Sequence, residues 1–185
     1  MASIGYKDLN DFLYDWLQIV APDQPIWIGG KSGNTGEDWS WTDGSRWSYT
    51  NWGPGQPSGG YDDGSCVHIN WNGGQGYWAD SNCDNEYSYF CSMTPQTSSA
   101  STPAIATKTV SLEDCPSDES WPFTWKIYGN MCYSLGNIEM DWNFAKEQCD
   151  TGVSFQFITN GLTSAFKNDP FFSSHMRWPQ LDPKA

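Results

Sequence analysis

Acidic, histidine and cysteine side chains are the residues of this chain whose types could do chemistry. Asp62 and Asp63 together with Asp80 could imitate the carboxylate pair of a glycosidase, but carboxylates in flexible loops without a burial signal make poor catalytic pairs. His68 alternates within a predicted strand beside Cys66, which favours a structural role over that of a general base. The sequence lacks a Gly-x-Ser-x-Gly elbow, a phosphate-binding glycine loop and a His-Glu-x-x-His motif. A binding protein is therefore favoured over an enzyme.

The cysteine pattern favours disulfides over a metal site. There are six cysteines, no Cys-x-x-Cys motif and only two histidines, which is too few for common zinc ligand sets. Disulfide frameworks belong to secreted proteins, so we expect an extracellular location. The first twenty residues do not form a signal peptide, because Asp8, Asp11 and Asp15 interrupt them. We therefore expect the chain to be a piece of a longer secreted protein.

The net charge of −13 disfavours two classes of binding partner. Nucleic-acid phosphates and anionic membrane surfaces would be repelled. There is no apolar run of 18 residues, so no membrane span is expected.

Local patterns predict several elements that must position any site. Apolar side chains at helical spacing predict a helix over residues 6–18, which the segment Ala21–Pro25 ends. Short apolar runs predict strands at residues 26–30, 66–70 and 87–91. Residues 31–76 are rich in Gly, Asn, Ser and Trp and predict a long loop region. Beyond a Ser/Thr/Pro-rich linker, a hairpin near residues 125–133 and a helix near 140–150 are expected.

The order of motifs between Trp27 and Cys91 resembles the second half of a C-type lectin-like domain. The segments that carry the resemblance are Trp27-Ile-Gly, Trp39-x-Trp41-x-Asp43-Gly-Ser, Asn51-Trp52, Gly55-Gln-Pro57, Cys66, Trp78-Ala-Asp80, Cys83 and Phe90-Cys91. The resemblance implies an α+β fold, with a small mixed β core, two helices, a long loop region and disulfide staples.

The resemblance also implies a domain layout. Residues 1–93 would form a domain that lacks its first strand and helix, 94–114 a linker, and 115–185 the first part of a second domain, as in tandem invertebrate members. The spacing Ile4 to Phe12 recurs as Ile158 to Phe166, which is consistent with a repeat. The implied bridges are Cys66–Cys83 and Cys115–Cys132.

Cys91 and Cys149 would then be left over, and two arrangements stay open. In one, each belongs to a truncated half-domain that needs flanking sequence to fold. In the other, residues 115–150 supply the missing strand and helix to residues 1–93, and Cys91 pairs with Cys149. The linker is long enough for the second arrangement, at about 3.3 Å per residue.

The family's calcium and sugar site would fall on a set of polar and aromatic residues. The implied metal ligands are Gln56, Asp63 and Asp80, because calcium takes six to eight oxygen ligands. Ser58 and Gly64 stand where the family has carboxylates, and Ala79 where it has an amide, so we expect a degraded calcium site. The implied ligand-binding set is Gln56, Ser58, Tyr61, Asp62, Asp63, Trp71 and Asp80. Tyr61 and Trp71 are candidates for ligand contact, whereas Trp39, Trp41, Trp52 and Trp78 are expected to pack under the loop.

The expected function is extracellular recognition of carbohydrate or glycoprotein without catalysis, with Ca²⁺ as the cofactor that the resemblance implies at a degraded site. The alternative is a calcium-independent module that binds a protein or another non-sugar ligand. Loss of sugar binding in EDTA would separate the two.

Overall fold

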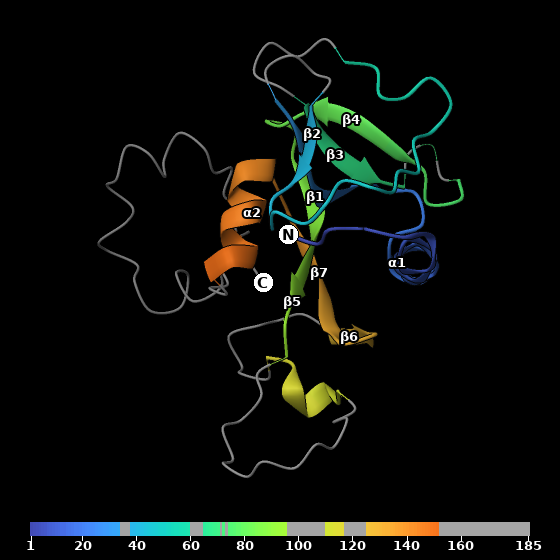
Figure 1. Ribbon diagram of the computed structural model, residues 1–185. Helices are drawn as coiled ribbons and strands as arrows, with labels where there is room; N and C mark the ends of the chain where they lie inside the picture. Colours follow the sequence, from blue (N-terminus) through green and yellow to red (C-terminus); the bar gives the residue numbers. More distant parts are fainter. Residues whose placement is uncertain are drawn as a thin grey trace, which may run out of the picture.

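The computed structural model describes residues 1–33, 38–59, 65–70, 72, 74–95, 110–116 and 125–151. Within these residues the chain forms one mixed sheet and two α-helices (Figure 1). The elements are α1 (Lys7–Val20), β1 (Ile26–Ser32), β2 (Trp39–Trp41), β3 (Ser65–Ile69), β4 (Trp78–Asn82), β5 (Tyr87–Met93), the 3-10 turn η2 (Leu112–Asp114), β6 (Trp125–Tyr128), β7 (Met131–Met140) and α2 (Trp142–Thr151).

Helix α1 forms where the apolar spacing predicts it, and it runs two residues further than expected. Leu9, Leu13, Trp16 and Leu17 are buried and lie on one face of the helix. The helix ends at Ala21, whose backbone N–H donates to the carbonyl of Leu17 before Pro22. The apolar face of α1 packs against the sheet, and this contact holds the helix in place.

The sheet has the strand order β4-β3-β1-β5-β7-β6, and β2 pairs with β1. Strand β1 lies parallel to β5 and antiparallel to β3. The predicted strands at 26–30, 66–70 and 87–91 are confirmed as β1, β3 and β5 within two residues. Strands β2 and β4 were not predicted. Trp39-Ser40-Trp41 is too short to predict a strand by itself, and Trp78–Asn82 does not alternate; both become strands by pairing with β1 and β3.

The segment after the linker completes this sheet. Strand β7 pairs with β5, and Cys91 forms a disulfide with Cys149 of α2. Gly136 lies opposite Tyr89, and a Cβ at position 136 would meet the tyrosine ring at 2.4 Å. The structure thus has the arrangement in which the later strands and helix join residues 1–93. The domain boundaries 1–93, 94–114 and 115–185 stay a prediction.

Three disulfides staple the described elements, and they are Cys66–Cys83, Cys91–Cys149 and Cys115–Cys132. The first joins β3 to the end of β4, and the third ties the segment after η2 to the β6–β7 hairpin. The first and third are the pairs that the family resemblance implies. The remaining pair joins the two segments that the linker separates.

The two helices lie on opposite sides of the sheet (Figure 1). On the α1 side the core contains Val67, Ile69 and Trp78, and on the α2 side it contains Cys66 and Trp27. Successive strand residues point to opposite faces, and this alternation separates two groups of polar residues. Asp80, opposite Val67, belongs to the α1 face, whereas His68 and Ser81 belong to the α2 face.

Candidate ligand-binding site

Trp78 is the platform under the candidate site. Its side chain is fully buried, and its indole N–H donates to the Oδ1 atom of Asn10 in α1 at 2.7 Å. Four aromatic rings pack edge-on around it, with ring centroids 5.6–5.9 Å away: Trp41, Trp47, Tyr49 and Trp52. Of the tryptophans expected to pack under the loop, Trp41 and Trp78 are buried in the core, and Trp39 and Trp52 pack against it while partly buried.

The loop that carries Gln56 is fastened to the start of β4. The backbone N–H of Trp78 donates to the carbonyl of Asn51 at 2.8 Å, and the N–H of Gly53 donates to the carbonyl of Trp78 at 2.9 Å. The Gln56 N–H then donates to Gly53, closing a turn in which Gly55 has a φ of +77°. Glycine adopts this left-handed conformation without strain. The turn brings Ser58 and Gly59 to Asp80, in the middle of β4.

The carboxylate of Asp80 binds this loop through hydrogen bonds. Its Oδ1 atom accepts hydrogen bonds from the backbone N–H of Ser58 at 2.6 Å and from the Ser58 hydroxyl at 3.0 Å. Its Oδ2 atom accepts from the N–H of Gly59 at 2.9 Å. The side-chain oxygen of Gln56 accepts from the Asp80 backbone N–H at 3.4 Å, and the Gln56–Pro57 peptide bond is cis. The structure thus brings together three sequence-predicted residues: Gln56, Ser58 and Asp80.

The Asp80 carboxylate is ionised at neutral pH, because its pKa is lowered. Burial alone would raise its pKa, since only 4% of the residue is exposed. The N–H of Ser58, the hydroxyls of Ser65 and Ser58, and the N–H of Gly59 outweigh burial and lower the pKa below its usual value. The contacts of Ser65 and Gly59 are the part of this site that sequence reasoning missed. Only the pairing of β3 with β4 brings Ser65 near.

The sequence was compared with models of known protein families. The model of the lectin C-type domain family matches residues 2–93. This chain contains a C-type lectin domain. The mixed sheet, the two helices and the three disulfides give it the α+β fold of C-type lectin-like domains.

Several curated proteins are similar to this lectin chain. A C-type lectin of Micrurus corallinus is 31% identical over 84 residues, which are 45% of this chain and 51% of that protein. The C-type mannose receptor 2 of Homo sapiens is 29% identical over 173 residues, which are 90% of this chain and 11% of the receptor. Proteoglycan 3 of Homo sapiens is 41% identical over 70 residues, 37% of this chain and 29% of that protein. The chain spans about half of the first relative and much less of the other two.

Among solved structures, the crystal structure of CEL-IV matches with 33% identity and a TM-score of 0.38. The match covers 44% of this chain and 56% of that chain.

Among the described residues of this site, Gln56 and Asp80 supply oxygen atoms of the kind that calcium prefers, and the structure uses both in hydrogen bonds. Calcium requires six to eight oxygen ligands with free lone pairs. Both oxygens of Asp80 accept hydrogen bonds, Oδ1 from the N–H and hydroxyl of Ser58 and Oδ2 from the N–H of Gly59. No group of three or more His, Cys, Asp or Glu side chains suited to a metal occurs in the described part of the chain.

Four of the predicted ligand-binding residues lie outside the described residues: Tyr61, Asp62, Asp63 and Trp71. Gly64 lies outside them as well. The predicted metal set of Gln56, Asp63 and Asp80 therefore stays a prediction. Ala79 is 1% exposed and lies opposite His68, on the face away from Asp80. An amide introduced at position 79 would enter that other face.

Proposed function

We propose that this C-type lectin domain recognises carbohydrate or glycoprotein outside the cell, without catalysis and with a degraded calcium site. The surface that supports this role is the loop over Asp80, in which Gln56 is half-buried and Ser58 is exposed. Amide and hydroxyl groups of this kind donate to and accept from sugar hydroxyls.

One observation carries the proposal: the closure of the loop onto a buried, ionised carboxylate. Three hydrogen bonds fix Ser58 and Gly59 on the carboxylate of Asp80. A loop fixed in advance loses little conformational entropy when a ligand binds. The hydrogen bonds of Asp80 thus take over the ordering role that calcium would have in a metal-dependent site.

A role without catalysis agrees with the electrostatics. A carboxyl that protonates a glycosidic oxygen needs a raised pKa, whereas the pKa of Asp80 is lowered. The disulfides support an oxidising, extracellular location. Neither helix in the described part of the chain is long and apolar enough to cross a membrane.

We also propose that residues 1–93 and 115–185 are consecutive lectin-like segments joined by residues 94–114. The 173-residue alignment with C-type mannose receptor 2 supports this, because an alignment of that length extends beyond the segment that the family model matches.

The test is retention on galactose- and mannose-agarose columns, with calcium and with EDTA. We expect retention that persists in EDTA and that Gln56→Ala weakens. Gln75→Ala is the matched control, since it removes an exposed amide elsewhere. Retention that EDTA abolishes would contradict the degraded calcium site, and failure to bind any sugar matrix would contradict carbohydrate recognition.

The alternative function is calcium-independent binding of a protein or another non-sugar ligand. The occupied carboxylate of Asp80 favours it as well, because it removes the family's usual means of holding sugar hydroxyls. Absence of sugar retention together with saturable binding to deglycosylated extracellular protein would favour this alternative.

A further inference from the structure

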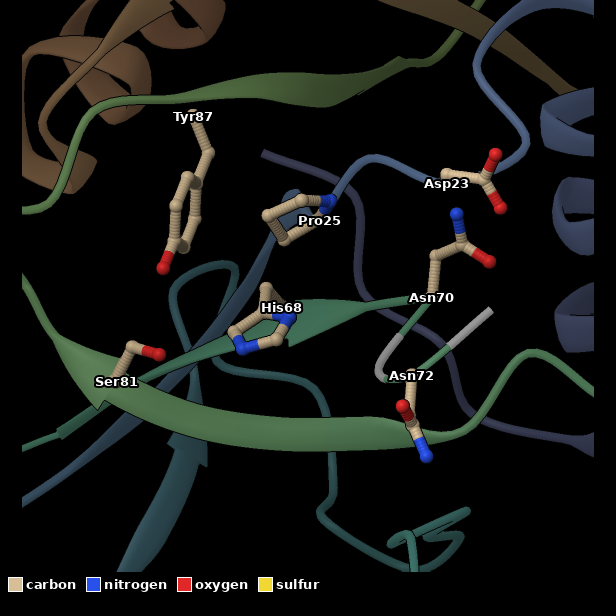
Figure 2. A pocket seen from close by; sticks show the side chains of 7 residues that line it. All are labelled: Asp23, Pro25, His68, Asn70, Asn72, Ser81 and Tyr87. Carbon is tan, nitrogen blue, oxygen red and sulfur yellow. The ribbon is translucent and has the colours of Figure 1, made fainter. Parts of the chain in front are cut away.

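A cavity lies on the face of β3 and β4 that is opposite to Asp80. Its volume is about 550 Å³, within the range of small-molecule sites. His68, Ser81 and Tyr87 from three strands line one part, and Figure 2 shows their polar groups facing a common space. The loop residues Asp23 and Asn72 line the opposite part.

Two buried polar atoms of this cavity lack hydrogen-bond partners. They are Nδ1 of His68 and Oδ1 of Asn70, in residues that are 5% and 3% exposed. The Asn70 amide nitrogen donates to the carbonyls of Ala21, Pro22 and Gln24 at 2.8–3.2 Å, which fixes the amide's orientation. Buried polar groups are nearly always satisfied in native proteins, so this pair points to a ligand or to water.

The lining is suited to a neutral, hydroxyl-bearing ligand. Six of the seven lining residues described have polar side chains, one of them a carboxylate, Asp23, and none is Lys or Arg. Together with the net charge of −13, this disfavours an anion. Burial lowers the pKa of His68 to about 4, while the Ile69 backbone and the charge of Asp80 only partly oppose it. The neutral imidazole offers one donor and one acceptor, which matches hydroxyl groups.

Tyr87 adds a rigid aromatic wall. Its ring packs at 4.5 Å from Trp27 and 5.4 Å from His68, between ring centroids. Its hydroxyl accepts from the Asn85 amide at 3.2 Å, and its own proton can be donated to a ligand. An aromatic face beside several hydroxyl partners suits the C–H face of a sugar ring.

We propose that this cavity binds one neutral sugar unit directly through hydrogen bonds, without metal and separately from the loop over Asp80. The inference takes its ligand class from the proposed function, but its site is independent of that loop.

The experiment is ¹⁵N NMR titration of the full chain in EDTA with the methyl glycosides of galactose, mannose and N-acetylglucosamine. We expect saturable shifts of the amides of residues 68–70, 81 and 87. Asn72→Gly should weaken binding about three- to tenfold, the effect of one lost hydrogen bond. The matched control is Gln75→Gly, because both residues have positive φ, at 56° and 50°, and both are exposed.

Ser81→Ala provides a second variant, which removes a hydroxyl from the strand side and should also weaken binding. The proposal is overturned if none of the three glycosides shifts the cavity amides, or if Asn72→Gly and Gln75→Gly bind equally. Shifts confined to residues 56–59 and 80 would overturn it and support the loop site instead. Cavity shifts with no response of residues 56–59 would support this inference while the loop site fails.

Discussion

The closure of the loop onto Asp80 can be tested with Asp80→Asn, which keeps the shape of the side chain and removes its charge. Asparagine retains one oxygen for the two bonds from Ser58, but its amide group would face the N–H of Gly59 as a second donor. Hydrogen bonds to charged groups contribute about 1.5–3 kcal/mol each. Losing one and weakening two should lower the free energy of unfolding by about 2–4 kcal/mol.

The pH dependence of this loss gives a stricter test. The folded-state pKa of Asp80 lies below the unfolded value of about 3.9. Its stabilising contribution is therefore complete above that value and is lost as the pH falls through the folded pKa. The difference between the native protein and Asp80→Asn should be full at neutral pH and should shrink as the pH falls below about 3.9.

Urea unfolding at several pH values measures both effects. Asp84→Asn is the matched control, because Asp84 is exposed and lies two residues beyond the end of β4. Surface changes of this kind stay within about 0.5 kcal/mol. If Asp80→Asn costs no more than the control, or costs the same at neutral and acid pH, the carboxylate does not hold the loop as described.

Three further predictions address the packing. Replacing Cys91 and Cys149 by Ser together should cost about 4 kcal/mol by urea unfolding, because the bridge spans 58 residues; a loss below about 1 kcal/mol would mean that the two segments do not depend on the bridge. Gly136→Ala should cost about 1–3 kcal/mol by clashing with Tyr89, and Tyr89→Leu should reverse part of the loss; additive losses would contradict that contact. The pKa of His68 is lowered to about 4, so stability should fall by up to about 3 kcal/mol as the pH drops from about 6.5 towards 4. His68→Leu should flatten this part of the curve, and an unchanged slope would contradict it.

The sequence carries the elements whose signal is local. The apolar spacing of α1 and the run at β1 predict those elements, and the spacing of Trp, Gly and Cys motifs indicates the family. The Gln56–Pro57 motif and Asp80 are likewise found from the family pattern, and the structure places them in contact.

The tertiary structure decides everything that depends on pairing between distant segments. Strands β2 and β4 form because β1 and β3 supply partners, since β2 is too short and β4 too polar to predict a strand from their own residues. The contact of Ser65 with Asp80 and the cavity around His68 depend on strand register and on which face each side chain takes.

The pairing of the cysteines likewise depends partly on sequence motifs and partly on long-range packing. The family resemblance implies two of the bridges, but it leaves two arrangements open for Cys91 and Cys149. The choice between them is made when β7 pairs with β5 and brings α2 against β5, because a disulfide forms only where two Cα atoms come within about 7 Å. Sequence thus determined the family and the local elements, and long-range packing decided how the two segments meet.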